Sequence, residues 1–140
     1  MRLAVLDTNV IVYAGIRKDG ASAKLIIDWV LEGQVIAVLS SGIVAEYREV
    51  MQREKFSRYD FPPLWLEFLI EEGLRLEEPD PWPHMLPDAK DAPFLALAHA
   101  AGAVLVTGNL KHFSAAARKG VTVLSPAEYL VQLTGGPSHP

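Results

Sequence analysis

The stretch that decides the fold is Leu3-Ala4-Val5-Leu6-Asp7-Thr8-Asn9, in which an apolar run passes directly into a polar triplet. An unbroken apolar run of this length is typical of a β-strand that is buried on both faces, and the triplet predicts a loop at its carboxyl end. The same pattern recurs along the chain. The other predicted strands are residues 35–39, 103–106 and 121–124, each followed by small polar or turn-forming residues.

Between these strands lie segments in which apolar residues recur at helical spacing. The clearest segments are residues 25–30, 43–51, 64–70 and 94–101. Buried strands that alternate with amphipathic helices are typical of right-handed β-α-β crossovers, which build a parallel sheet covered on both faces. The sequence therefore predicts an α/β fold of three layers. Four prolines within residues 78–91 predict a long loop before the last of these helices.

Length and composition indicate one globular domain. We expect it to occupy residues 1–134 of the 140, followed by a flexible tail at 135–140. Half of the residues are hydrophobic and 21% are charged, which excludes intrinsic disorder, and no apolar run is long enough to span a membrane. Because the start does not resemble a secretory signal, we expect a cytoplasmic protein. The chain has no cysteine, which excludes disulfides and thiolate zinc sites.

The net charge of −4 argues against a protein that holds nucleic acid by bulk positive charge. An acidic protein can still bind a phosphate backbone if a local basic strip or a divalent cation supplies the positive charge. Basic residues that could contact such a backbone are Arg48, Arg53, Lys55, Lys90 and Lys111.

Acidic side chains stand near the predicted carboxyl ends of the strands. Asp7 follows the first strand, Glu46 lies on the helix after the second, and Asp88 and Asp91 precede the helix at 94–101. In an open parallel sheet the ligand site lies beyond these strand ends, so we expect the acids to gather there. Carboxylates can hold Mg²⁺ or Mn²⁺, which suits phosphodiester hydrolysis because the cation activates water and neutralises developing charge.

Each acid also has a structural interpretation. Asp7 could cap a helix that begins near Val10, although Asn9 is an equally suitable cap at a better position. Asp91 could cap the helix at 94–101 and bind a cation with its other oxygen. At 100° per residue, Glu46 borders the apolar stripe of its helix, whereas Glu49 points outward.

Three other residues could take part in the site, but each has a simpler structural interpretation. Asp88 could be a supporting or loop residue instead of a ligand. His99, in a helix of small apolar residues, is interpreted as a packing residue. His112 could meet a phosphate, but a solvated loop tip explains it more simply. There is no G-x-S-x-G elbow, Walker motif or zincin spacing, which excludes those enzyme classes.

Four motifs in order carry a family resemblance. They are Val5-Leu6-Asp7-Thr8-Asn9-Val10, Val44-Ala45-Glu46, Asp88-x-x-Asp91-x-x-Phe94-Leu95-Ala96-Leu97-Ala98 and Leu105-Val106-Thr107-Gly108-Asn109. Together they resemble a PIN domain, and most closely the bacterial and archaeal toxins of toxin–antitoxin pairs. The resemblance covers about residues 2 to 130.

This resemblance implies a five-stranded parallel sheet and an endoribonuclease that cleaves single-stranded RNA with Mg²⁺ or Mn²⁺. It places Asp7, Glu46 and Asp91 on the family's acids and Asp88 on an additional common one, all as metal ligands. We expect Asn9, Thr107, Asn109 and Lys111 to orient ligands or contact substrate. Many members carry an acid where this chain has Asn109, which offers a neutral carbonyl oxygen and leaves the number of metal ions open.

Two other function classes remain open. Asn109 favours a catalytically weak or inactive module that binds RNA or protein. A phospho-acceptor receiver domain also gathers acids, threonine and lysine at a sheet edge, but this chain lacks the adjacent acid pair early in the sequence and a well-placed lysine. Stable phosphorylation of Asp7 by a small phosphodonor would identify a receiver.

The expected partners are RNA, a cognate antitoxin protein and a second copy of the chain. We expect no association with a membrane. We expect a homodimer because one helix carries more large apolar side chains than a single face can bury. These side chains are Phe61, Leu64, Trp65, Phe68 and Leu69.

Overall fold

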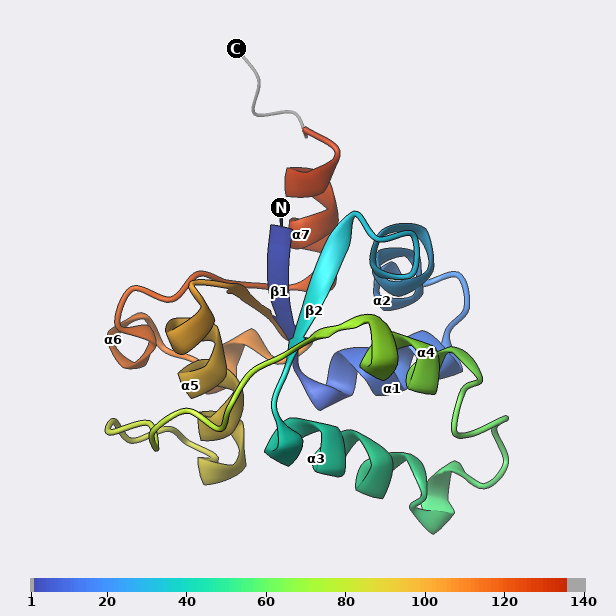
Figure 1. Ribbon diagram of the computed structural model, residues 1–140, viewed down its shortest axis with the longest axis horizontal. Coiled ribbons are helices and arrows are strands. Elements are labelled where there is room, and N and C mark those ends of the chain that lie inside the picture. Colours follow the sequence, from blue (N-terminus) through green and yellow to red (C-terminus); the bar gives the residue numbers. More distant parts are fainter. Residues whose placement is uncertain (1, 136–140) are drawn as a thin grey trace.

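A computed structural model describes residues 2–135 of the protein and contains one sheet of five parallel strands (Figure 1). The strands are β1 (Arg2–Leu6), β2 (Val35–Leu39), β3 (Leu74–Arg75), β4 (Val104–Val106) and β5 (Val123–Leu124). Their order across the sheet is β3-β2-β1-β4-β5, and every neighbouring pair is parallel. The predicted α/β fold with a five-stranded parallel sheet is confirmed. Of the five strands, only β3 was not predicted, because it has two residues and both are exposed.

The helices and helical turns fill the connections between the strands, except for α7, which follows the last strand. The α-helices are α1 (Thr8–Ile16), α2 (Ala21–Lys24), α3 (Ser41–Met51), α4 (Trp65–Glu72), α5 (Ala92–Ala101), α6 (Ala115–Arg118) and α7 (Pro126–Leu133). A π-helical turn, Leu25–Val30, continues α2, and 3₁₀ turns occupy Glu54–Phe56, Ala89–Asp91 and Leu110–His112. All four segments with helical spacing are therefore helical over most of their length.

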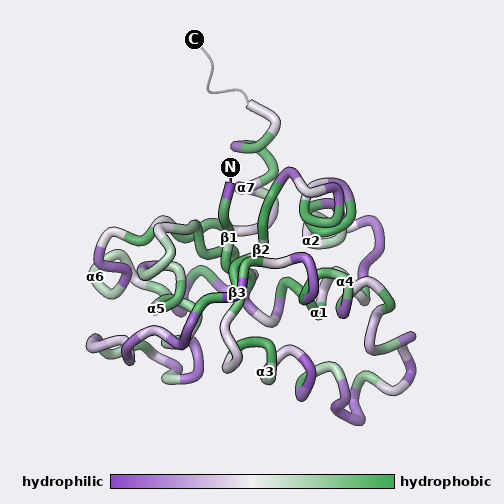
Figure 2. Tube along the Cα trace, in the orientation of Figure 1, coloured by the Kyte–Doolittle hydropathy of each residue, from purple (hydrophilic) through white to green (hydrophobic). Residues whose placement is uncertain are grey.

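The helices cover both faces of the sheet. In Figure 1, α5 and α6 lie on one side of the sheet, and α1, α2 and α4 lie on the other. The middle layer is the most hydrophobic part of the chain, as the colours along β1 and β2 show (Figure 2). Ala4, Val5 and Leu6 of β1 are fully buried, as are Leu105 and Val106 of β4. This confirms the prediction that the first apolar run is a strand buried on both faces, and the strand order places it at the centre of the sheet.

Two contacts fix the carboxyl end of β1. The backbone N–H of Asp7 donates to the carbonyl oxygen of Val106 at 2.9 Å, so Asp7 continues the pairing with β4 by one residue. The hydroxyl of Tyr47, which is fully buried, donates to the carbonyl oxygen of Leu6. The start of α1 and the middle of α3 are thereby held at the same edge of the sheet.

The long loop and the predicted tail are described in part. Residues 76–88 contain neither helix nor strand, as the prolines predict, and the loop ends in the 3₁₀ turn Ala89–Asp91. The predicted tail at 135–140 lies outside the described residues except for Gly135, whose N–H donates to the Gln132 carbonyl oxygen. Among residues 2–135, no helix has the length and hydrophobicity that a bilayer span requires.

Candidate functional site

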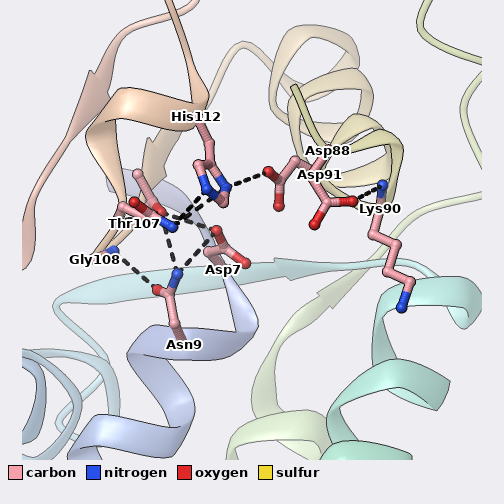
Figure 3. Close-up of polar contacts among 9 residues, drawn as sticks. Asp7, Asn9, Asp88, Lys90, Asp91, Thr107, Gly108 and His112 are labelled. Carbon is pink, nitrogen blue, oxygen red and sulfur yellow. Dashed lines mark hydrogen bonds and ion pairs between the residues drawn. The ribbon is translucent and has the colours of Figure 1, made fainter. Parts of the chain in front are cut away.

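The side chain of Asp7 lies at the centre of the polar cluster at the carboxyl edge of the sheet (Figure 3). It is only 5% exposed, and its Oδ2 accepts a hydrogen bond of 2.9 Å from the Thr107 hydroxyl. The pKa of Asp7 is raised from 3.8 to about 6, and burial is the largest cause. The Thr107 hydrogen bond opposes this rise, and the nearby carboxylates of Asp91 and Glu46 add to it. Asp7 occupies the N-cap position of α1, but its side chain makes no capping hydrogen bond, so the capping interpretation is wrong.

Asn9 and Thr107 hold the two loops of the site together. Because α1 begins at Thr8, Asn9 lies within its first turn, and the expectation that Asn9 is the better cap is wrong. Its Oδ1 instead accepts from the backbone N–H of Gly108 at 2.9 Å, which ties α1 to the loop after β4. Thr107 is fully buried, and its hydroxyl oxygen also accepts from the Asn109 N–H at 3.0 Å.

Glu46 and Glu49 differ as the helical phase predicts. Glu46 is half-buried and accepts a hydrogen bond from the Thr8 hydroxyl, so it faces the start of α1 beside Asp7. Glu49 is exposed and forms an ion pair of 2.9 Å with Arg53, one turn along the helix. The structure therefore brings Glu46 to the site and leaves Glu49 on the surface.

Asp91 and Asp88 stand before α5 but have different surroundings. The Asp91 side chain is 13% exposed, and its Oδ2 lies 2.9 Å from His112 Nδ1 (Figure 3). Burial raises the pKa of Asp91, while its hydrogen bond and charge interaction with His112 act in the opposite direction. Asp88 is exposed and caps the 3₁₀ turn by accepting from the Lys90 N–H at 2.9 Å, as the loop interpretation predicts.

Of the two histidines that the sequence did not assign to the site, His112 departs from its interpretation. His112 is no free loop tip, because it contacts Asp91 and also Asn109, whose Nδ2 lies 2.9 Å from His112 Nε2. Its neighbour Lys111 is exposed on the same turn. His99 packs edge-on against Trp82, as the packing interpretation predicts, but it does so on the exposed face of α5. Only the position of His112 after the Thr107-Gly108-Asn109 motif could have indicated its place in the site.

The donor chemistry of the cluster fits a hard divalent cation. Within residues 2–135, no group of three or more acidic or histidine side chains is close enough to form a complete ligand set. Mg²⁺ commonly needs only one or two carboxylates and takes its remaining ligands from water. The charge of Asp91 raises the pKa of Asp7, and a cation held by these carboxylates would relieve that repulsion. Two carboxylates with waters are therefore the cation site that this geometry allows.

The basic strip is partly neutralised by the protein itself. Arg48 pairs with Glu67 at 2.6 Å, and Arg53 pairs with Glu49. Lys55 lies over the Phe56 ring at 5.2 Å. Of the basic residues proposed to contact RNA, Lys90 and Lys111 are exposed on the turns that border the acidic cluster.

Comparison with known proteins agrees with this architecture. The sequence matches the family description "PIN domain" over residues 3–111, and no curated protein sequence matches it. A chain of VapBC2 from Rickettsia felis, crystallised with a DNA fragment from the promoter, has 14% identity and a TM-score of 0.59, covering 88% of this chain and 98% of that chain. A chain of FitAcB from Neisseria gonorrhoeae has 19% identity and a TM-score of 0.56, covering 89% and 98%. The protein belongs to the PIN-domain family, and these structures share its fold.

Proposed function

We propose that this PIN-domain protein is a Mg²⁺- or Mn²⁺-dependent endoribonuclease that cleaves single-stranded RNA. The observation that carries the proposal is the buried Asp7 carboxylate, whose pKa is raised to about 6 at the sheet edge it shares with Asp91 and Glu46. A cluster of buried carboxylates lowers the stability of the fold unless a cation or a proton neutralises the charge. Such acids are therefore candidates for a functional site.

The residues divide into ligands and supporting groups. Asp7 and Asp91 would hold the cation, and Asp88, whose charge reaches Asp91, is a further ligand candidate. A bound Mg²⁺ would supply charge neutralisation and an activated water for in-line attack, leaving 5′-phosphate and 3′-hydroxyl ends. Glu46 would orient the attacking water or the cation.

The supporting groups act through the ligands and the substrate. The Thr107 hydroxyl donates to the Asp7 carboxylate, and the backbone N–H of Asn109 donates to the Thr107 hydroxyl. Asn9 connects α1 to the loop after β4 through the backbone N–H of Gly108. Lys90 and Lys111 would contact RNA phosphates as exposed cations beside the cluster.

The test is RNA cleavage under controlled metal conditions. Purified protein should cleave single-stranded RNA with Mg²⁺ or Mn²⁺ and stop in excess chelator. Asp7→Asn and Asp91→Asn should each suppress cleavage and keep the fold, whereas Asp19→Asn, at an exposed position, should have no effect. Cleavage in excess chelator, or 2′,3′-cyclic phosphate ends, would refute the metal mechanism.

We also propose that the ribonuclease is the cytoplasmic toxin of a toxin–antitoxin pair. Its PIN-domain membership and the fold it shares with chains of VapBC2 and FitAcB support this role. Induced expression should arrest growth, Asp7→Asn should relieve the arrest, and a protein encoded by a neighbouring reading frame should also relieve it and co-purify with the toxin. Unimpaired growth with active, soluble protein present would argue against a toxin.

The second candidate function is an RNA- or protein-binding module with little or no turnover. Asn109, which stands where many family members have an acid, favours it because one anionic ligand is lost. Saturable RNA binding by the wild type in Mn²⁺, with no cleavage over the same period, would support this candidate against the ribonuclease.

The proposed homodimer has a surface that fits it. The expectation that one helix carries all five side chains is wrong, because Phe61 and Leu64 precede α4. Leu64 is 96% exposed and Phe68 on α4 is 48% exposed, while Phe61 and Trp65 are half-buried and Leu69 is buried. Light scattering should give twice 15.4 kDa. Phe68→Glu should then favour the monomer because an unpaired carboxylate is costly at an apolar interface, whereas Val131→Glu, on a similarly exposed residue of α7, should not.

A further inference from the structure

The 3₁₀ turn after β4 places one imidazole between two side chains of the acidic cluster. His112 ends this turn, and its Nδ1 lies 2.9 Å from Asp91 Oδ2 (Figure 3). Its Nε2 lies 2.9 Å from Nδ2 of Asn109. Three residues from two separated segments therefore form a continuous chain that ends on a carboxylate of the cluster.

The contact with Asp91 defines the donor. A carboxylate oxygen can only accept, so Nδ1 of His112 carries a proton and donates it to Asp91 Oδ2. The Asn109 amide nitrogen lies 2.9 Å from Nε2 and 3.3 Å from Nδ1, so it packs against the imidazole across both ring nitrogens. Asn109 therefore limits the movement of the ring, and the Asp91 contact decides which nitrogen donates.

The contact also leaves one oxygen of Asp91 available. Among residues 2–135, Oδ2 accepts from His112, and Oδ1 has no side-chain hydrogen bond. A carboxylate held by one oxygen cannot rotate freely, so its other oxygen is kept in one orientation. Ligands fixed in this way bind metals more tightly than ligands that must be ordered on binding.

We propose that His112, oriented by Asn109, is the positioning residue that fixes Asp91 for the cation. The inference rests on the proposed ribonuclease function and concerns the ligand Asp91, with no direct contact between His112 and the cation. It also gives Asn109 a use in this chain, because its amide lies against the imidazole of His112.

The turn that carries His112 is anchored independently of the imidazole. Its neighbour Phe113 is 1% exposed, and the Phe113 carbonyl oxygen accepts from Arg118 Nε at 2.8 Å. Replacement of the His112 ring should therefore leave the turn folded. A change in metal binding can then be assigned to the lost hydrogen bond.

The experiment compares two replacements of His112 by the affinity of the RNA-free protein for Mn²⁺, measured by calorimetry. His112→Phe keeps a ring but no donor, and should weaken binding by roughly 10- to 100-fold, the usual effect of removing a hydrogen bond to a metal ligand. His112→Asn keeps an N–H near the position of Nδ1 and should restore most of the affinity. His84→Phe, at an exposed histidine outside the site, is the matched control and should bind as the wild type does.

A second readout needs no metal. Nitrogen-15 NMR of the metal-free wild type should show a proton on Nδ1 of His112, and Asp91→Ala should reduce the fraction of protein in that form. The Nε2–H tautomer in the wild type would overturn the inference. Equal Mn²⁺ affinities for the wild type and His112→Phe would also overturn it and leave the proposed function intact. Failure of the wild type to bind Mn²⁺ would overturn both.

Discussion

The substitution Asp7→Asn should stabilise the metal-free protein at neutral pH while it removes a proposed ligand. The pKa of Asp7 rises from 3.8 to about 6 on folding, mainly because burial disfavours the charged form. A raised pKa means that the native state binds the proton more tightly than the unfolded state does. The wild type therefore loses stability as the pH rises from about 4 through about 6.

The size of the effect follows from the shift. About two pKa units, at 1.36 kcal/mol per unit, correspond to a penalty of about 3 kcal/mol above pH 7 and to almost none below pH 4. Asparagine carries no charge at any of these pH values, and its oxygen can still accept from the Thr107 hydroxyl, so it should avoid the penalty. The advantage of Asp7→Asn should grow from near zero at pH 4 to as much as about 3 kcal/mol at pH 7.5.

The assay is urea unfolding in the presence of chelator at pH 4, 6 and 7.5, with unfolding free energies taken from linear extrapolation. Asp19→Asn, at an exposed position, is the control and should match the wild type at each pH. The burial argument fails if Asp7→Asn is no more stable than the wild type at pH 7.5. It also fails if any advantage is the same at all three pH values.

Three further outcomes are expected. Excess Mg²⁺ should raise the unfolding free energy of the wild type, by about 2.7 kcal/mol at one hundred times the dissociation constant, and should not stabilise Asp7→Asn in a parallel titration. In the cleavage assay, Glu46→Gln should lose most activity and Glu49→Gln little; the reverse would show that Glu49 faces the substrate. Gly15→Ala should lose roughly 1–3 kcal/mol of stability, because the new Cβ would lie 2.6 Å from Cε1 of Phe61. Thermal unfolding should show that the double variant with Phe61→Leu recovers part of this loss.

Local patterns were sufficient for four of the five strands and for the main helices between them, but α6 and α7 were not predicted. Strands buried on both faces have continuous apolar runs, and helices that cover them have a periodic apolar stripe, so each type is visible within a short window. The same locality explains the success with Glu46 and Glu49, because helical phase depends only on the distance from neighbouring residues. The strand β3 was not predicted because its two exposed residues carry no such pattern.

The sequence by itself also determined that acids would stand at the strand ends, but only the tertiary structure decided which of them meet. Strand order places β1 beside β4, so Asp7 and Thr107 form a hydrogen bond although 100 positions separate them. His112 reaches Asp91 across 21 positions, and Arg48 pairs with Glu67 across 19. The spacing of residues within one helix or strand follows from backbone geometry, whereas contacts between loops follow from which strands pair and how the helices pack on them. No short window of sequence contains that information. For this reason the sequence predicted a solvated loop tip at His112, whereas the structure places this side chain against Asp91.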